Sequence, residues 1–134
     1  MSQIIPILTV VDAVGLATTS NVNGNVYMFD NKGYLGEQEG GYELTTKCTD
    51  GDIIQWTIVA IQSDADISIA NFRGTAINTY VIRPAYYPSM NEPYWGSRVE
   101  LGGNPAGNYQ YTFDIVINNT HYAFDPFLAV ASGQ

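Results

Sequence analysis

The sequence predicts an all-β protein: a single-domain antiparallel β-sandwich of jelly-roll type spanning residues 1–134, with about eight to nine strands. Two observations carry this prediction. Apolar residues recur with a period of two, and short groups of turn residues separate the apolar segments. No segment combines a convincing helical period with caps at both ends, which agrees with an all-β fold. The chain has 134 residues and is 46% apolar, which suits one domain with a core that needs no disulfide or metal ion.

The clearest strand lies between Tyr109 and Ile117. Its odd-numbered residues are aromatic or branched and share one face, and they are Tyr109, Tyr111, Phe113, Ile115 and Ile117. This alternation is typical of a half-buried antiparallel strand. Asn118 and Asn119 follow, and asparagine tolerates the positive φ of a tight hairpin turn. An extended pattern resumes over Thr120–Val130, so we expect a C-terminal hairpin.

Pro126 interrupts the second strand of this hairpin, in Phe124-Asp125-Pro126-Phe127. Proline cannot donate to a strand ladder, so a sheet edge or a bulge is expected here. We expect Asp125 to have a structural role and to accept hydrogen bonds from nearby backbone N–H groups. The two flanking phenylalanines should hold the bend against the core.

The segment Ile53–Ile61 is apolar on nearly both faces, which predicts a central strand covered on both sides. Ile4–Asp12 is interpreted in the same way, as a buried strand with a polar end. Cys48 shares a face with other apolar residues and is expected to be buried, and a single cysteine excludes an intrachain disulfide. The remaining expected strands are Asn25–Phe29, Tyr42–Cys48, Ile67–Phe72, Thr79–Arg83 and Arg98–Leu101.

The charge pattern excludes some partners and favours another. The protein has 13 acidic and 5 basic side chains and a net charge of −8, which repels nucleic acid and anionic lipid. Charged residues make up only 13% of the chain, so the surface is weakly charged and self-association, as a homo-oligomer or an ordered assembly, is expected. No apolar run is long enough to span a membrane, and the N-terminus lacks a signal-peptide pattern, so a cytoplasmic location is expected.

The residues that could carry chemistry are few. His121 is the single histidine and Cys48 the single cysteine, and no nucleophile motif surrounds either. We therefore expect no enzymatic activity, no cofactor and no zinc site. Asp64 and Asp66 have the spacing of the first ligands of a calcium loop, but the glycine and the distal glutamate of an EF-hand loop are missing. A solvated turn is the preferred interpretation of these two aspartates.

The segment from Tyr86 to Trp95 is rich in aromatic residues and proline, and we expect a loop that cannot pair as a regular strand. Its candidate ligand-binding residues are Tyr86, Tyr87, Tyr94 and Trp95. Exposed rings could stack on the apolar face of a sugar. The same rings could instead anchor the loop on the sandwich or form a subunit contact, since tyrosine and tryptophan are favoured at interfaces. The sequence leaves these three roles open.

Several short segments, in order along the chain, resemble the AidA/PixA family of bacterial inclusion-body proteins. They are Ser2-Gln3-Ile4-Ile5-Pro6-Ile7-Leu8-Thr9-Val10-Val11-Asp12, Gly51-Asp52-Ile53-Ile54-Gln55-Trp56, Phe72-Arg73-Gly74, Tyr94-Trp95-Gly96 and Phe124-Asp125-Pro126-Phe127-Leu128. The resemblance implies a β-fold and accumulation in the cytoplasm, in some relatives as crystalline inclusions, and it supplies no catalytic residues. This chain is shorter than some relatives between Val14 and Tyr27. With three methionines it does not fit a methionine-storage role.

Three functional hypotheses follow. The first is a non-catalytic, self-associating protein of the inclusion-body type. The alternative is a lectin-like carbohydrate-binding module built on residues 86–95, with a glycan as its partner and calcium at the acidic turns. The third, a hydrolase using His121, has the least support because no second catalytic group is identifiable beside it.

Overall fold

The computed structural model describes residues 2–31, 41–88 and 93–133, and within them the chain forms eleven strands and two short helices. In chain order the elements are β1 (Ile4–Val11), α1 (Ala13–Thr19), β2 (Val26–Asp30), β3 (Thr45–Thr49), β4 (Ile53–Ala60), β5 (Ile67–Arg73), α2 (Thr75–Asn78), β6 (Ala85–Tyr87), β7 (Tyr94–Arg98), β8 (Gly107–Gln110), β9 (Thr112–Ile117), β10 (Thr120–Phe124) and β11 (Phe127–Ala131).

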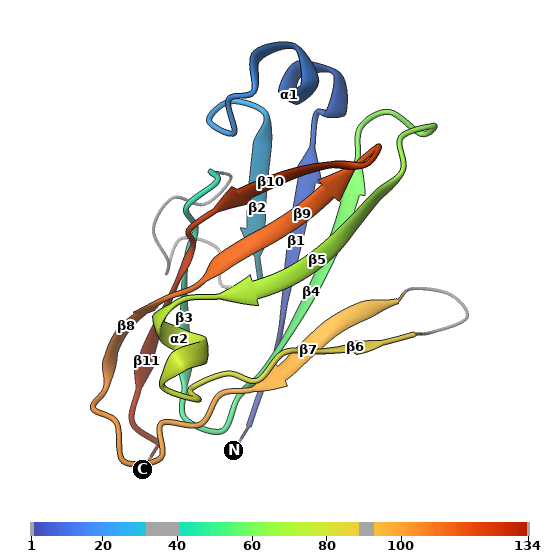
Figure 1. The fold of residues 1–134 in the computed structure, drawn as a ribbon. Coiled ribbons are helices and arrows are strands. Elements are labelled where there is room, and N and C mark those ends of the chain that lie inside the picture. Colours follow the sequence, from blue (N-terminus) through green and yellow to red (C-terminus); the bar gives the residue numbers. More distant parts are fainter. Residues whose placement is uncertain (1, 32–40, 89–92, 134) are drawn as a thin grey trace.

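The strands form two layers, which confirms the all-β fold class. One layer is a five-stranded sheet in the order β2-β1-β4-β7-β6, which we call the large sheet. The other contains two three-stranded sheets, the β9 sheet (β10-β9-β5) and the β11 sheet (β3-β11-β8). In Figure 1 the strands of the β9 sheet cross in front of the large sheet. The pairing is mixed: β1 runs parallel to β4 and β3 parallel to β11, whereas the other described pairs are antiparallel.

The predicted C-terminal hairpin is confirmed. Ile117 pairs with Thr120, and the two turn residues Asn118 and Asn119 have φ angles of 48° and 71°. The hairpin is longer than one sheet, because β9 and β10 continue past a bend as β8 and β11. At the bend Tyr111 N–H donates to the Pro126 carbonyl at 3.0 Å, so each expected strand is divided into two. This division accounts for part of the excess over eight or nine strands.

An aromatic cluster joins the two layers. The Trp56 ring lies 4.7 Å from that of Phe72, and Phe72 lies 5.1 Å from Phe113. The Trp56 indole N–H donates to the Tyr111 hydroxyl at 3.1 Å, which satisfies the polar group of a buried tryptophan. Burial in this cluster raises the pKa of the Tyr111 phenol. As expected from alternation, the five odd-numbered residues from Tyr109 to Ile117 are buried, and so is Cys48.

The two short helices lie in segments where the sequence shows no convincing helical period with caps at both ends. At α1, Asp12 acts as the N-cap: its Oδ1 accepts from Gly15 N–H at 3.1 Å and from the Gln62 side chain at 2.7 Å. The Gln62 side chain also accepts from Ala13 N–H at 2.8 Å. The hydrogen bond from Gln62, followed by that from Gly15, lowers the pKa of the Asp12 carboxyl. The interaction that secures this seven-residue helix is therefore tertiary.

Two expected strands lie elsewhere. Thr79–Arg83 is not a strand, because α2 ends at Asn78 and Tyr80 has a φ of 63°, which is incompatible with extended backbone. Arg98–Leu101 is replaced by β7, which ends at Arg98. Beyond it, Leu101 N–H donates to the Asp50 side chain at 2.9 Å, so this segment is fixed by a turn and does not continue the sheet.

Candidate functional site

The aromatic segment forms two strands, so the expectation of an unpaired loop is wrong. β6 and β7 pair antiparallel, with Tyr86 opposite Trp95 and Tyr87 opposite Tyr94. Pro84 precedes β6, and Pro93 precedes β7, so the described prolines remove no donor from the paired residues. The hairpin continues the large sheet at its edge and projects away from the rest of the molecule (Figure 1).

Cross-strand pairing separates the four candidate residues into two groups on opposite faces of the hairpin. Tyr86 and Trp95 lie on the face turned towards the β9 sheet, with their rings 5.8 Å apart. Trp95 is half-buried and contacts Phe72 at 5.5 Å, so the core holds its ring, whereas Tyr86 is 52% exposed. The two rings border a pocket of about 360 Å³, which is also lined by Trp56, Thr57, Ile58, Ile67, Ser68, Ile69, Pro93 and Tyr94.

Tyr87 and Tyr94 lie on the other face, and their rings stack at 5.2 Å with an interplanar angle of 21°. Beneath them is Gly96. A Cβ atom at this position would lie 3.1 Å from the Tyr94 ring, so the glycine allows the stacked pair to sit close to the strand. Beside the pair is a hollow of about 350 Å³, also lined by Ile4, Ile53 and Arg98.

This hollow belongs to a wider surface that sequence reasoning missed, the side of the large sheet that faces away from the core. We call it the apolar outer face. The strand registers place on it Ile4, Pro6, Leu8, Val10, Tyr27, Phe29, Ile53, Gln55, Thr57, Val59, Ala85, Tyr87, Tyr94, Gly96 and Arg98. Among these residues Arg98 carries the only charge. Of the nine large apolar residues that are exposed in the described chain, five lie on this face: Ile4, Leu8, Phe29, Val59 and Tyr87.

The apolar outer face corrects two expectations. The segments Ile4–Asp12 and Ile53–Ile61 were expected to be buried on both sides, but Ile4 is 56% and Val59 46% exposed. The signal was present in the sequence as strands that are apolar on both faces. Alternation alone cannot distinguish a covered apolar face from an uncovered one, because both give the same run of residues.

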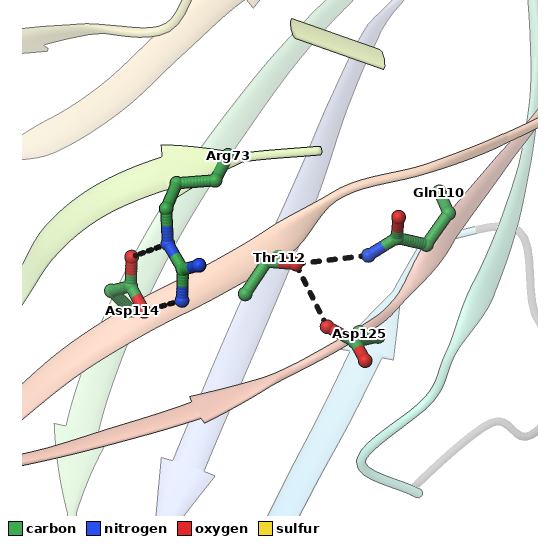
Figure 2. Close-up of polar contacts among 5 residues, drawn as sticks. All are labelled: Arg73, Gln110, Thr112, Asp114 and Asp125. Atoms are coloured by element: carbon green, nitrogen blue, oxygen red, sulfur yellow. Dashed lines mark hydrogen bonds and ion pairs between the residues drawn. The ribbon is translucent and has the colours of Figure 1, made fainter. Parts of the chain in front are cut away.

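On the outer side of the β9 sheet there are polar contacts instead, five of whose side chains are drawn in Figure 2. Arg73 makes a bidentate contact with Asp114, with Nε–Oδ2 at 2.7 Å and Nη2–Oδ1 at 2.8 Å. This pairing raises the pKa of the Arg73 guanidinium. The Thr112 hydroxyl donates to Asp125 at 2.9 Å and accepts from Gln110 at 3.0 Å. Asp125 therefore accepts from a side chain, where a backbone donor was expected, because the bend at Tyr111 brings Thr112 beside it.

The remaining candidate residues lie in separate parts of the fold. Asp64 and Asp66 are exposed in the turn between β4 and β5, where Asp66 N–H donates to the Asn118 side chain at 3.0 Å. Within the described residues no group of three His, Cys, Asp or Glu side chains could hold a metal ion. His121 is exposed on β10, and Cys48 is buried on β3 in a different sheet.

No helix among the described residues is long and apolar enough to cross a membrane.

Comparison with solved structures identifies the fold. The crystal structure of the PixA inclusion body protein from Burkholderia cenocepacia J2315 matches with a TM-score of 0.72 and 14% sequence identity, covering 98% of this chain and 96% of that one. This match confirms the resemblance to inclusion-body proteins at the level of the fold. Two structures of an endo-fucoidan hydrolase of glycoside hydrolase family 107 match at a TM-score of 0.39 with 11% identity, covering 67% of this chain and 13% of theirs, and a match that weak supports no argument.

Comparison by sequence identifies the family. No curated protein matches the chain. A family model described as a domain of unknown function, DUF8788, matches residues 3–123. Because this match covers most of the chain, the protein belongs to the DUF8788 family, and its fold is that of the PixA inclusion body protein.

Proposed function

We propose that this protein is a non-catalytic, self-associating protein of the inclusion-body type. The observation that carries the proposal is the apolar outer face: among its described strand residues, five large apolar side chains are exposed and Arg98 carries the only charge. Soluble monomers rarely leave a contiguous apolar surface of this extent uncovered, and such surfaces mark interaction sites.

The distribution of charge supports the same proposal. Copies with a net charge of −8 repel one another over most of their surface. A contact surface without carboxylates avoids that repulsion at short range, and burying apolar area there provides the favourable free energy. The likeness of fold to a protein described as an inclusion body protein adds support, and a cytoplasmic location is part of the proposal.

The non-catalytic part of the proposal is supported by the placement of the single histidine and the single cysteine. His121 is exposed on β10 in the β9 sheet, and Cys48 is buried on β3 in the β11 sheet. A nucleophile and its base must lie within hydrogen-bonding reach of each other, and these two residues belong to different sheets.

Sedimentation velocity and light scattering on the purified wild-type protein, over a wide range of concentrations, test the proposal. We expect the mean mass to rise with concentration. We also expect the association to persist at about 1 M salt, because apolar contacts are not screened whereas attraction between charges is. A protein that stays strictly monomeric at high concentration would rule out self-association.

A second function, glycan binding, is favoured by one observation: Tyr86 is 52% exposed beside Trp95, which the core holds in place above a pocket of about 360 Å³. Fixed aromatic rings at the edge of a small pocket suit the apolar face of a sugar, and the volume lies within the usual range for small ligands. A glycan array probed with wild type and with Tyr86→Ala tests this function, and signals that the substitution removes would support it.

The array should also be probed with and without a calcium chelator. Loss of a glycan signal on chelation would assign Asp64 and Asp66 a part in binding, whereas a signal that the chelator leaves unchanged would separate the aromatic site from those two aspartates. An array without signals for either protein would remove glycan binding from consideration.

A further inference from the structure

We propose that two copies of this chain associate through their apolar outer faces, packed sheet against sheet about a two-fold axis. This inference rests on the proposed function, self-association, and names the surface and the partner. The partner is a second copy because each copy offers an apolar face whose described strand residues include no carboxylate, which is the complement that the same face on another copy requires.

The size of the face suits a stable dimer. Its five strands have 5, 8, 8, 5 and 3 residues, and each residue covers about 3.3 by 4.8 Å of the sheet. The strands therefore cover about 460 Å² in projection, and the relief of the side chains raises the accessible area above this value. A standard interface buries about 800 Å² per partner, so one face of this sheet supplies more than half of the area a specific contact needs.

Charge favours this face over the others. Four acidic side chains lie away from this face: Asp114 and Asp125 on or beside the β9 sheet, and Asp64 and Asp66 in the β4–β5 turn. Asp12 lies at the end of β1, where it caps α1. Two copies that meet through the β9 sheets would bring acidic groups together, whereas two apolar outer faces would not. Arg98 lies at the end of β7, where it can remain solvated at the rim of the contact.

The hollow above Gly96 gives the face a recess that a side chain of the second copy can fill. Tyr87 and Tyr94 form one wall, Ile4 and Ile53 another, and Gly96 contributes no side chain. Hot spots of interfaces lie where an apolar anchor fills such a recess. β4 is the middle strand of the sheet, so a two-fold axis along β4 places β1 of each copy over β7 of the other. An apolar side chain of β1 then meets the hollow of the opposite copy.

The test compares Leu8→Asp with Val14→Asp by sedimentation equilibrium. Leu8 is 38% exposed at the middle of the apolar outer face, and Val14 is 61% exposed on α1, outside that face. Both substitutions replace an exposed aliphatic side chain by the same negative charge. We expect Leu8→Asp to weaken association by at least about tenfold, because a carboxylate would be buried in the contact, and Val14→Asp to leave it unchanged.

A second measurement is independent of any loss of stability. Thr57 lies on the outer side of β4, close to the proposed axis, so Thr57→Cys should be linked to the same residue of a second copy by a short bismaleimide. Ser68→Cys, on the outer side of the β9 sheet, is the matched control and should give little covalent dimer. Cys48 is buried and should contribute no background.

The outcomes separate the inference from the proposed function. If wild type associates, and neither Leu8→Asp nor the linker distinguishes this face from its controls, the interface is wrong while self-association stands. If wild type is monomeric at every concentration, both are wrong. If Leu8→Asp fails to fold, as circular dichroism would show, the cross-linking of Thr57→Cys against Ser68→Cys decides.

Discussion

The two outward-facing sheet surfaces of this sandwich have different side chains on similar backbones. On the β9 sheet, Arg73 pairs with Asp114, and Thr112 joins Gln110 and Asp125 (Figure 2). On the large sheet, the equivalent outward positions of β1 are Ile4, Pro6, Leu8 and Val10. Both layers bury apolar inner residues, among them Ile5 and Ile7 of β1 and Phe113 and Ile115 of β9, so the requirements of the core do not explain the difference.

The contrast indicates that the outer side of the β9 sheet, with its polar side chains, is the one suited to contact with water. An outward residue of a solvated strand contributes little to stability. Polar side chains are therefore usual at such positions, because they keep the protein soluble. The large sheet departs from that pattern over all of β1 and part of β4. Its outward residues are suited to a surface that is covered for part of the protein's life.

The largest difference should appear when two neighbouring residues of β1, one on the inner and one on the outer side, are each replaced by alanine. Ile7 is fully buried and Leu8 is 38% exposed. We expect Ile7→Ala to lower the free energy of unfolding by about 2–5 kcal/mol, because it leaves a cavity, and Leu8→Ala to lower it by about 1 kcal/mol or less. Urea denaturation at a concentration where the protein is monomeric measures both.

In self-association the order should reverse: Leu8→Ala should weaken it, and Ile7→Ala should weaken it only as far as it unfolds the protein. Equal effects of the two substitutions on stability would mean that the outer face of β1 is covered in the monomer. That result would remove the contrast between the two sheets.

The sequence predicts the polar face better than the apolar one. Between Tyr109 and Ile117 one face is polar, so alternation identifies the buried side, and the structure confirms it. In β1 and β4 both faces are apolar, and periodicity then carries no information about which is covered. The information that would decide is the position of the second layer, which depends on contacts between distant segments.

The same limitation explains the other differences. α1 has seven residues, too few for a helical period, and its cap depends on Gln62, fifty positions from Asp12. From the sequence, the four aromatic candidates are expected to form one site. Strand pairing separates them, because successive residues of a strand point to opposite faces. Only the register, which the sequence does not reveal, assigns Tyr86 and Trp95 to one face.

Filling the hollow should weaken association without unfolding the protein. In Gly96→Ala the new methyl group would meet the Tyr94 ring at 3.1 Å and the Tyr87 ring at 3.4 Å, so the stacked pair must shift towards the space that the second copy would enter. We expect a several-fold weaker association and a nearly unchanged melting temperature. Gly103→Ala, where nothing lies within 4 Å, is the control. An unchanged association constant for Gly96→Ala would mean that the side chain of the second copy does not enter the hollow above Gly96.

A smaller effect should come from Asp12, which lies at the end of β1 beside the apolar outer face. Its pKa is lowered in the folded state, by the Gln62 side chain first and Gly15 N–H second. The resulting stabilisation is therefore present above the unfolded-state pKa of about 4 and is lost as the pH falls through the lower folded-state value. Asp12→Asn retains a capping side chain but not the charge.

Thermal melts of wild type and Asp12→Asn should accordingly differ at neutral pH and converge below about pH 4. A difference between the two proteins that stays constant well below pH 4, after the carboxyl group is protonated in both states, would assign the effect to the shape of the side chain, since aspartate titrates in this range and asparagine does not.

The smallest effect should come from the polar face itself. Arg73 is 56% exposed and Asp114 17%, so solvent screens their attraction although the contact is bidentate. A double-mutant cycle with Arg73→Ala and Asp114→Ala should give a coupling well below the loss from Ile7→Ala, and added salt should reduce it further. Neither substitution should change association, because the pair lies on the sheet opposite the proposed contact. Association that fell with Arg73→Ala but not with Leu8→Asp would exchange the roles of the two faces, and the polar sheet would then be the one that meets a second copy.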